Sequence, residues 1–120
     1  MNENNVKRIV FSSGSGVYGD QAEIILSEDF GPLLPVSFYG ASKLCAEAYI
    51  SSFCGMKGFK ASIFRFANVV GLRQTHGVAF DFIHKLKNDN SKLDVLGNGF
   101  QSKSYIDVED IFSAIQLVVD

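Results

Sequence analysis

The segment Tyr39-Gly-Ala-Ser-Lys43 places a phenol and an ammonium four residues apart, at the start of a predicted helix that runs to about Lys57. Residues i and i+4 share one face of a helix and can reach the same small volume. A cation beside a phenol favours the phenolate, so the pair can work as a base near neutral pH. Tyrosine and lysine also meet at this spacing by chance in many helices, so the surrounding sequence must decide whether the pair is catalytic.

Apolar segments on both sides of this helix predict strands. The β-branched run Val6–Ser13 ends in the hydroxyls of Ser12 and Ser13, and Ala61–Phe66 follows the helix. Such apolar runs are typical of strands covered on both faces. The other predicted elements are strands at Leu93–Leu96 and Ser104–Ile106 and helices at Gly77–Lys87 and Ile111–Val119, with Thr75 and Asp107 as N-terminal caps.

Strands and helices that alternate at this spacing predict an α/β fold with a parallel sheet and right-handed crossovers. Within the long helix we expect Leu44, Ala48 and Phe53 to form the buried side. Sites in parallel sheets lie beyond the carboxyl ends of the strands. Both Ser12-Ser13 and Ala67-Asn68 follow such ends, so we expect them on the same side as Tyr39.

The composition describes a globular chain. Its 120 residues permit one domain or part of one, with 47% hydrophobic and 20% charged residues. A net charge of −2 gives no electrostatic reason to expect nucleic acid or a membrane as partner. The polar start and the lack of a long apolar run favour a cytoplasmic location. Cys45 and Cys54 lack metal-site spacing, so we expect no metal and two free, buried thiols.

The loop Gly14-Ser-Gly-Val-Tyr-Gly19 matches the G-x-G-x-x-G pattern of dinucleotide-binding turns. That fingerprint requires the loop to open a helix that packs on the sheet. The residues after Gly19 are too few for such a helix before the loop Glu28–Pro35, which contains two prolines. We therefore expect these glycines to bring backbone close to a sugar or nicotinamide ring.

Four segments in order support a catalytic interpretation of the Tyr-Lys pair: Val17–Asp20, Ser37–Lys43, Ile63–Gly71 and Gly97–Tyr105. Together they resemble the extended short-chain dehydrogenase/reductases, and most closely the NAD-dependent epimerase/dehydratase family that includes UDP-glucose 4-epimerase. The resemblance covers nearly the whole chain.

The resemblance implies a partial Rossmann-like, doubly wound parallel sheet. Residues 1–120 would form a single partial domain, made of the C-terminal half of the cofactor domain and the start of the substrate-binding part. Family members hold the pyrophosphate of NAD on a glycine-rich strand–turn–helix unit, which would precede Val6. The sequence is therefore interpreted as an interior segment of an enzyme.

By resemblance, Tyr39 is the base that takes the proton of the sugar 4-hydroxyl, and Lys43 also binds the nicotinamide ribose. The serine or threonine of most relatives aligns with Gly14, so Ser13 and Ser15 on either side are both candidates for the hydroxyl donor. Dehydratases of the family carry an Asp-Glu pair at Ser15 and the next residue, which disfavours 4,6-dehydration.

The resemblance also assigns binding residues. Those implied for NAD are Ser12, Ser13, Tyr39, Lys43 and Ala67, and those for the nucleotide sugar are Gly14, Asn68, Val78, Phe82 and Lys103. Val78 and Phe82 can equally be packing residues of a helix. Lys103 stands where relatives usually have an arginine, so the charge is kept and the bidentate fork is lost.

The function that the resemblance implies is an NAD-dependent nucleotide-sugar 4-epimerase of the UDP-glucose/UDP-galactose type. It would act on a nucleotide-sugar substrate, as a homodimer in the intact enzyme. Two alternatives stay open: a UDP-sugar decarboxylase or reductase on the same scaffold, and a truncated chain without catalytic activity.

Overall fold

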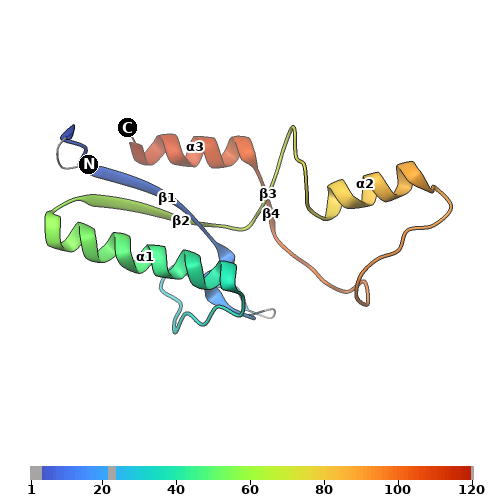
Figure 1. Ribbon diagram of the computed structural model, residues 1–120, viewed down its shortest axis with the longest axis horizontal. Coiled ribbons are helices and arrows are strands. Elements are labelled where there is room, and N and C mark those ends of the chain that lie inside the picture. Colours follow the sequence, from blue (N-terminus) through green and yellow to red (C-terminus); the bar gives the residue numbers. More distant parts are fainter. Residues whose placement is uncertain (1–3, 22–23, 120) are drawn as a thin grey trace. The chain divides into compact units, whose positions relative to one another are not determined.

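The computed structural model describes residues 4–21 and 24–119 (Figure 1). It divides into two compact units, one of Met1–Ala67 with Ile115–Asp120 and one of Asn68–Ala114. The elements in chain order are β1 (Arg8–Gly14), the 3₁₀ helix η2 (Ser15–Tyr18), α1 (Phe38–Lys57), β2 (Lys60–Phe66), β3 (Asn68–Val70), α2 (Val78–Asn88), β4 (Tyr105–Asp107) and α3 (Val108–Val119). The interpretation as one partial domain stays a prediction.

The first unit is built on the parallel pair of β1 and β2, in register from Arg8 opposite Lys60 to Gly14 opposite Phe66. Figure 1 shows α1 lying along both strands. This arrangement confirms the predicted parallel α/β fold. The strand predicted at Val6 begins two residues later, at Arg8, and its guanidinium donates to the carbonyls of Val118 and Val119 in the last turn of α3.

Helix α1 has a capped start and a glycine end. The Ser37 side chain accepts a hydrogen bond from the Gly40 N–H at 3.0 Å, as an N-cap serine does. At the other end Gly58 has φ 67°, the left-handed conformation that favours glycine at a helix C-terminus. The predicted helix Tyr39 to Lys57 is confirmed to within one residue.

The prediction of the buried side of α1 was wrong. Its buried residues are Gly40 and Glu47, whereas Ala48 and Phe53 are exposed and Leu44 is half-buried. Apolar periodicity missed this face because its members are a glycine and a polar side chain that bonds to the sheet. Cys45 is exposed and Cys54 is half-buried, so the thiols are free, as expected, but not buried.

The second unit contains β3 and β4, a short parallel pair with Asn68 opposite Tyr105. The sequence predicted β4 and missed β3. The strand predicted at Leu93–Leu96 is absent from the structure, where the carbonyl of Asp94 in that segment accepts from the Lys85 ammonium at 2.8 Å.

The helix starts of the second unit test the two predicted caps. The prediction that Asp107 caps α3 is confirmed, because its carboxylate accepts a hydrogen bond from the Glu109 N–H at 2.8 Å. The prediction that Thr75 caps α2 was wrong, because α2 begins after Gly77 and its N-terminus has no side-chain cap. None of the described helices is long and apolar enough to cross a membrane.

Candidate active site

Lys43 joins the start of α1 to the carboxyl end of β1. Its ammonium donates a hydrogen bond to the Ser12 carbonyl at 2.8 Å and lies 5.6 Å from the centre of the Tyr39 ring. It also lies 5.2 Å from the centre of the Phe11 ring. The Tyr39 side chain is 64% exposed, so a ligand can reach the phenol. The structure therefore brings together the phenol, the ammonium and the strand end that the sequence predicted.

The serines of the predicted site have different environments. Ser13 is 4% exposed, and its hydroxyl donates to a Glu47 carboxylate oxygen at 2.5 Å. A hydroxyl has one proton to donate, so Ser13 cannot donate to a substrate while it holds this bond. Ser12 and Ser15 are exposed. Ser15, at the start of η2, is therefore the better placed of the two candidate hydroxyl donors.

Glu47 and Arg65 form an ion pair beneath this site. Arg65 on β2 donates from Nη2 to Glu47 Oε2 at 2.8 Å and from Nε to both carboxylate oxygens at 3.1 and 3.2 Å. Its Nη1 also reaches the Tyr18 hydroxyl and the Glu28 carbonyl, both at 3.2 Å. The Arg65 guanidinium therefore links β2 by hydrogen bonds to α1, to η2 and to the loop at Glu28.

The pair fixes the charge of both partners. Burial alone would raise the pKa of the Glu47 carboxyl, but hydrogen bonds from Arg65 and Ser13 and the charge of Arg65 bring that pKa below its ordinary value. The hydrogen bond to Glu47 raises the pKa of the Arg65 guanidinium, against the effect of burial. Both groups are therefore ionised at neutral pH.

The sequence analysis missed Glu47, Arg65 and Tyr18. Two features of the sequence point in retrospect to the first two of these residues. Glu47 continues the four-residue spacing of Tyr39 and Lys43, and Arg65 is a lone charge within the otherwise apolar stretch Ile63–Phe66. A charge on a covered strand needs a partner, and a carboxylate on the facing helix supplies one.

The glycine-rich loop is packed against backbone. After Gly14 the chain forms the four-residue 3₁₀ helix η2, and α1 begins only at Phe38. Among the described residues of this loop the helix is a short 3₁₀ helix and not an α-helix, and the expectation that the dinucleotide fingerprint does not apply stays a prediction. Gly19 has φ 82°, and a Cβ there would stand 2.2 Å from the Leu34 carbonyl oxygen. The close approach in the structure is thus to neighbouring backbone.

The second unit holds most of the predicted substrate residues. The side-chain amide of half-buried Asn68 donates to the Ser104 carbonyl at 3.1 Å, and its backbone N–H reaches the same oxygen at 3.2 Å. Asn68 is therefore bound to the residue next to Lys103, whose own side chain is exposed. Val78 and Phe82 lie one turn apart on α2, which has no buried residue. Ala67 ends the first unit, between β2 and β3.

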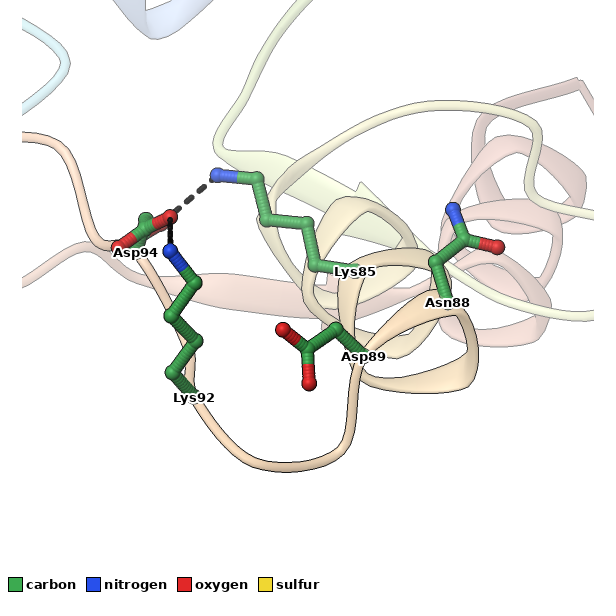
Figure 2. Close-up of a pocket in the computed structure, with 5 residues that line it drawn as sticks. All are labelled: Lys85, Asn88, Asp89, Lys92 and Asp94. Carbon is green, nitrogen blue, oxygen red and sulfur yellow. Dashed lines mark hydrogen bonds and ion pairs between the residues drawn. The ribbon is translucent and has the colours of Figure 1, made fainter.

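A hollow of about 220 Å³ lies at the end of α2 (Figure 2). It is lined by Lys85, Asn88, Asp89, Lys92 and Asp94. In it Lys92 lies 3.5 Å from an Asp94 carboxylate oxygen, the Lys85 ammonium donates to the Asp94 carbonyl, and Asp89 accepts two hydrogen bonds from Ser91. None of the predicted site residues lines this hollow.

The fold and this arrangement of side chains define a Rossmann-type enzyme segment with a Tyr-Lys pair at a strand end. The sequence profile of the NAD dependent epimerase/dehydratase family matches residues 1–120, and the chain belongs to that family. It is 34% identical to a provisionally named UDP-glucose 4-epimerase of Methanocaldococcus jannaschii, over 95% of this chain and 38% of that protein.

Solved structures of the family agree in fold. UDP-N-acetylglucosamine 4-epimerase from Methanobrevibacter ruminantium, in complex with UDP-N-acetylmuramic acid, has a TM-score of 0.85 at 35% identity and covers 96% of this chain. UDP-glucuronic acid 4-epimerase from Bacillus cereus, in complex with UDP-glucuronic acid and NAD, has a TM-score of 0.81 at 26% identity over 94% of this chain. The chain spans 38% and 35% of these two proteins, respectively.

Proposed function

We propose that this chain carries the acid/base part of an NAD-dependent UDP-sugar 4-epimerase. The observation that supports this most is the position of the Lys43 ammonium, between the Tyr39 ring and the Ser12 carbonyl at the end of β1. In this proposal the Tyr39 hydroxyl exchanges the proton of an alcohol as a general acid/base, with the Lys43 ammonium beside its ring. The names of the relatives support the sugar-nucleotide class.

The described residues fit the nicotinamide-ribose end of NAD. Lys43 uses one of its three N–H donors on Ser12, which leaves two for ribose hydroxyls. The exposed Tyr39 hydroxyl and the backbone at Ala67, beyond the end of β2, are the other groups we assign to this end. When bound, NAD would supply the hydride acceptor for the sugar C4 and return the hydride to the opposite face.

The residues of the chain have separate roles in this proposal. Tyr39 takes the proton of the sugar 4-hydroxyl and later returns it, while Lys43 holds the phenolate. Ser15 donates a hydrogen bond to the sugar oxygen. Asn68 and Lys103 bind the diphosphate, with Lys103 as a point charge. Gly14, Val78 and Phe82 border the sugar and the base, and the homodimer and the cytoplasmic location stay predictions.

The test is a product assay on an intact enzyme that contains residues 1–120, with NAD and one of two substrates. UDP-glucose should give UDP-galactose without net formation of NADH, because the hydride returns to the sugar. UDP-glucuronate should give no UDP-xylose. Formation of UDP-xylose and CO2 would indicate a decarboxylase in place of the 4-epimerase, and stoichiometric NADH would indicate a one-way oxidoreductase.

A further inference from the structure

One face of α1 carries three functional side chains in succession. Tyr39, Lys43 and Glu47 follow each other at four-residue spacing, so they lie on one stripe of the helix. The second and third both contact the end of β1, Lys43 at the Ser12 carbonyl and Glu47 at the Ser13 hydroxyl.

These two contacts act on neighbouring groups: Lys43 bonds to the Ser12–Ser13 peptide unit, and Glu47 bonds to the side chain on the Cα at the end of that unit. The Ser12 carbonyl is bonded to the Ser13 nitrogen, and a peptide unit is planar and stiff. When the Ser13 side chain is fixed by Glu47, the direction of the Ser12 carbonyl is therefore restricted as well. That carbonyl is the acceptor that holds the Lys43 ammonium beside Tyr39.

Glu47 is itself held rigidly. Glu47 is 5% exposed, and its carboxylate accepts three hydrogen bonds from Arg65 in addition to the one from Ser13. Arg65 is the residue directly opposite Ser13 in the sheet. A buried ion pair is a weak source of stability compared with apolar packing of equal volume, but a removed partner leaves a costly charge. The main effect of these hydrogen bonds is therefore to fix the position of the Glu47 carboxylate beside Ser13, more than to raise the overall stability of the fold.

We propose that Glu47 is a positioning residue for the Tyr39–Lys43 pair, acting through Ser13 and the Ser12 carbonyl. Arg65 orients the Glu47 carboxylate, and Glu47 touches neither substrate nor cofactor. Its effect on catalysis rests on the proposed function, whereas its effect on Lys43 does not.

Ser13→Ala is the cleanest variant, because it removes the link to the peptide and leaves the ion pair intact. The first readout is the acylation rate of Lys43, followed by mass spectrometry, with exposed Lys57 at the end of the same helix as internal reference. Ser13→Ala should raise the rate at Lys43 several-fold relative to Lys57. Asp94→Asn, which breaks the surface pair with Lys92, should leave it unchanged.

The second readout is steady-state kinetics of the whole protein with NAD and UDP-glucose. Ser13→Ala and Glu47→Gln should each lower kcat about tenfold, the equivalent of one hydrogen bond, with KM little changed. The double variant should lose little more than either single one, because both changes cut the same link.

Unchanged Lys43 acylation in Ser13→Ala, with only a lower melting temperature, would overturn the proposal. So would strict additivity of the two losses in kcat. If the intact parent enzyme has no epimerase activity, the proposed function fails, and the acylation rates still decide whether Glu47 positions Lys43.

Discussion

Gly40, in the first turn of α1, lies against the Gly16 carbonyl, and a Cβ at Gly40 would stand 2.4 Å from that oxygen. The same Cβ would also be 3.0 Å from Pro35. Gly40→Ala must therefore push η2 away from the helix start that carries Tyr39. We expect it to lower the free energy of unfolding by about 1–3 kcal/mol, as overpacking does, and to lower turnover. Denaturant unfolding and kinetics measure both.

Gly55 in the same helix is the matched control, since a Cβ there would meet nothing within 4 Å. Gly55→Ala should be neutral or stabilise by about 0.5 kcal/mol, because alanine is the better helix former. Equal effects of the two substitutions would mean that the approach of Gly16 to Gly40 does not constrain the helix start.

The ion pair of Glu47 and Arg65 predicts a particular pH dependence of stability. The folded state lowers the pKa of Glu47 below its ordinary 4.5, so its stabilisation is present in full above that value and is lost as pH falls through the lowered pKa. At neutral pH we expect Glu47→Gln to cost about 3 kcal/mol. The difference between parent and variant should shrink below pH 4.5, as measured by urea unfolding across that range.

The exposed ion pair of Lys92 and Asp94 is the control for the buried pair of Glu47 and Arg65. Its side chains are 68% and 81% exposed, so Asp94→Asn should change stability by less than about 1 kcal/mol. A gap between parent and Glu47→Gln that stays constant down to strongly acidic pH would show that the carboxylate charge does not provide the stabilisation.

Sequence patterns located the elements with long apolar runs and missed those decided by contacts distant in the chain. The helix at Tyr39 and both strands of the first unit could be predicted from the spacing of apolar residues and from runs of β-branched residues. The three-residue strand β3 has no such signal, because it forms only by pairing with Tyr105–Asp107, which lies far away in the sequence. The Tyr39–Lys43 pair was visible as a local spacing. The bond between Ser13 and Glu47 joins residues 34 apart and required the fold.

Tyr39→Phe should lower turnover by about two to four orders of magnitude, the usual contribution of a positioned acid/base. Tyr39 is 64% exposed, and within the described part of the chain its ring lies beside the Lys43 ammonium, so stability should change little. Steady-state kinetics and the affinity for the nucleotide sugar are the measurements. A variant with near parental turnover would remove Tyr39 from the mechanism.

Lys103 is expected to act through its charge. It is exposed and adjacent to Ser104, to which Asn68 is hydrogen-bonded, and the proposal assigns both Asn68 and Lys103 to the diphosphate. Lys103→Ala should raise KM about tenfold, and Lys103→Arg should be tolerated or bind better. Lys87→Ala, a change of an exposed lysine on α2, is the control. Equal KM values in both alanine variants would make Lys103 a solvated surface charge.

A polypeptide of residues 1–120 should not bind NAD with micromolar affinity. The loop Gly14–Gly19 contains the 3₁₀ helix η2, so it does not supply the α-helix N-terminus that binds a pyrophosphate in dinucleotide sites. The groups we assign to NAD, Tyr39, Lys43 and Ala67, serve only its nicotinamide-ribose end. Calorimetric titration of NAD measures the affinity directly. Stoichiometric micromolar binding, lost on replacement of Gly16 by valine, would make this loop the dinucleotide site after all.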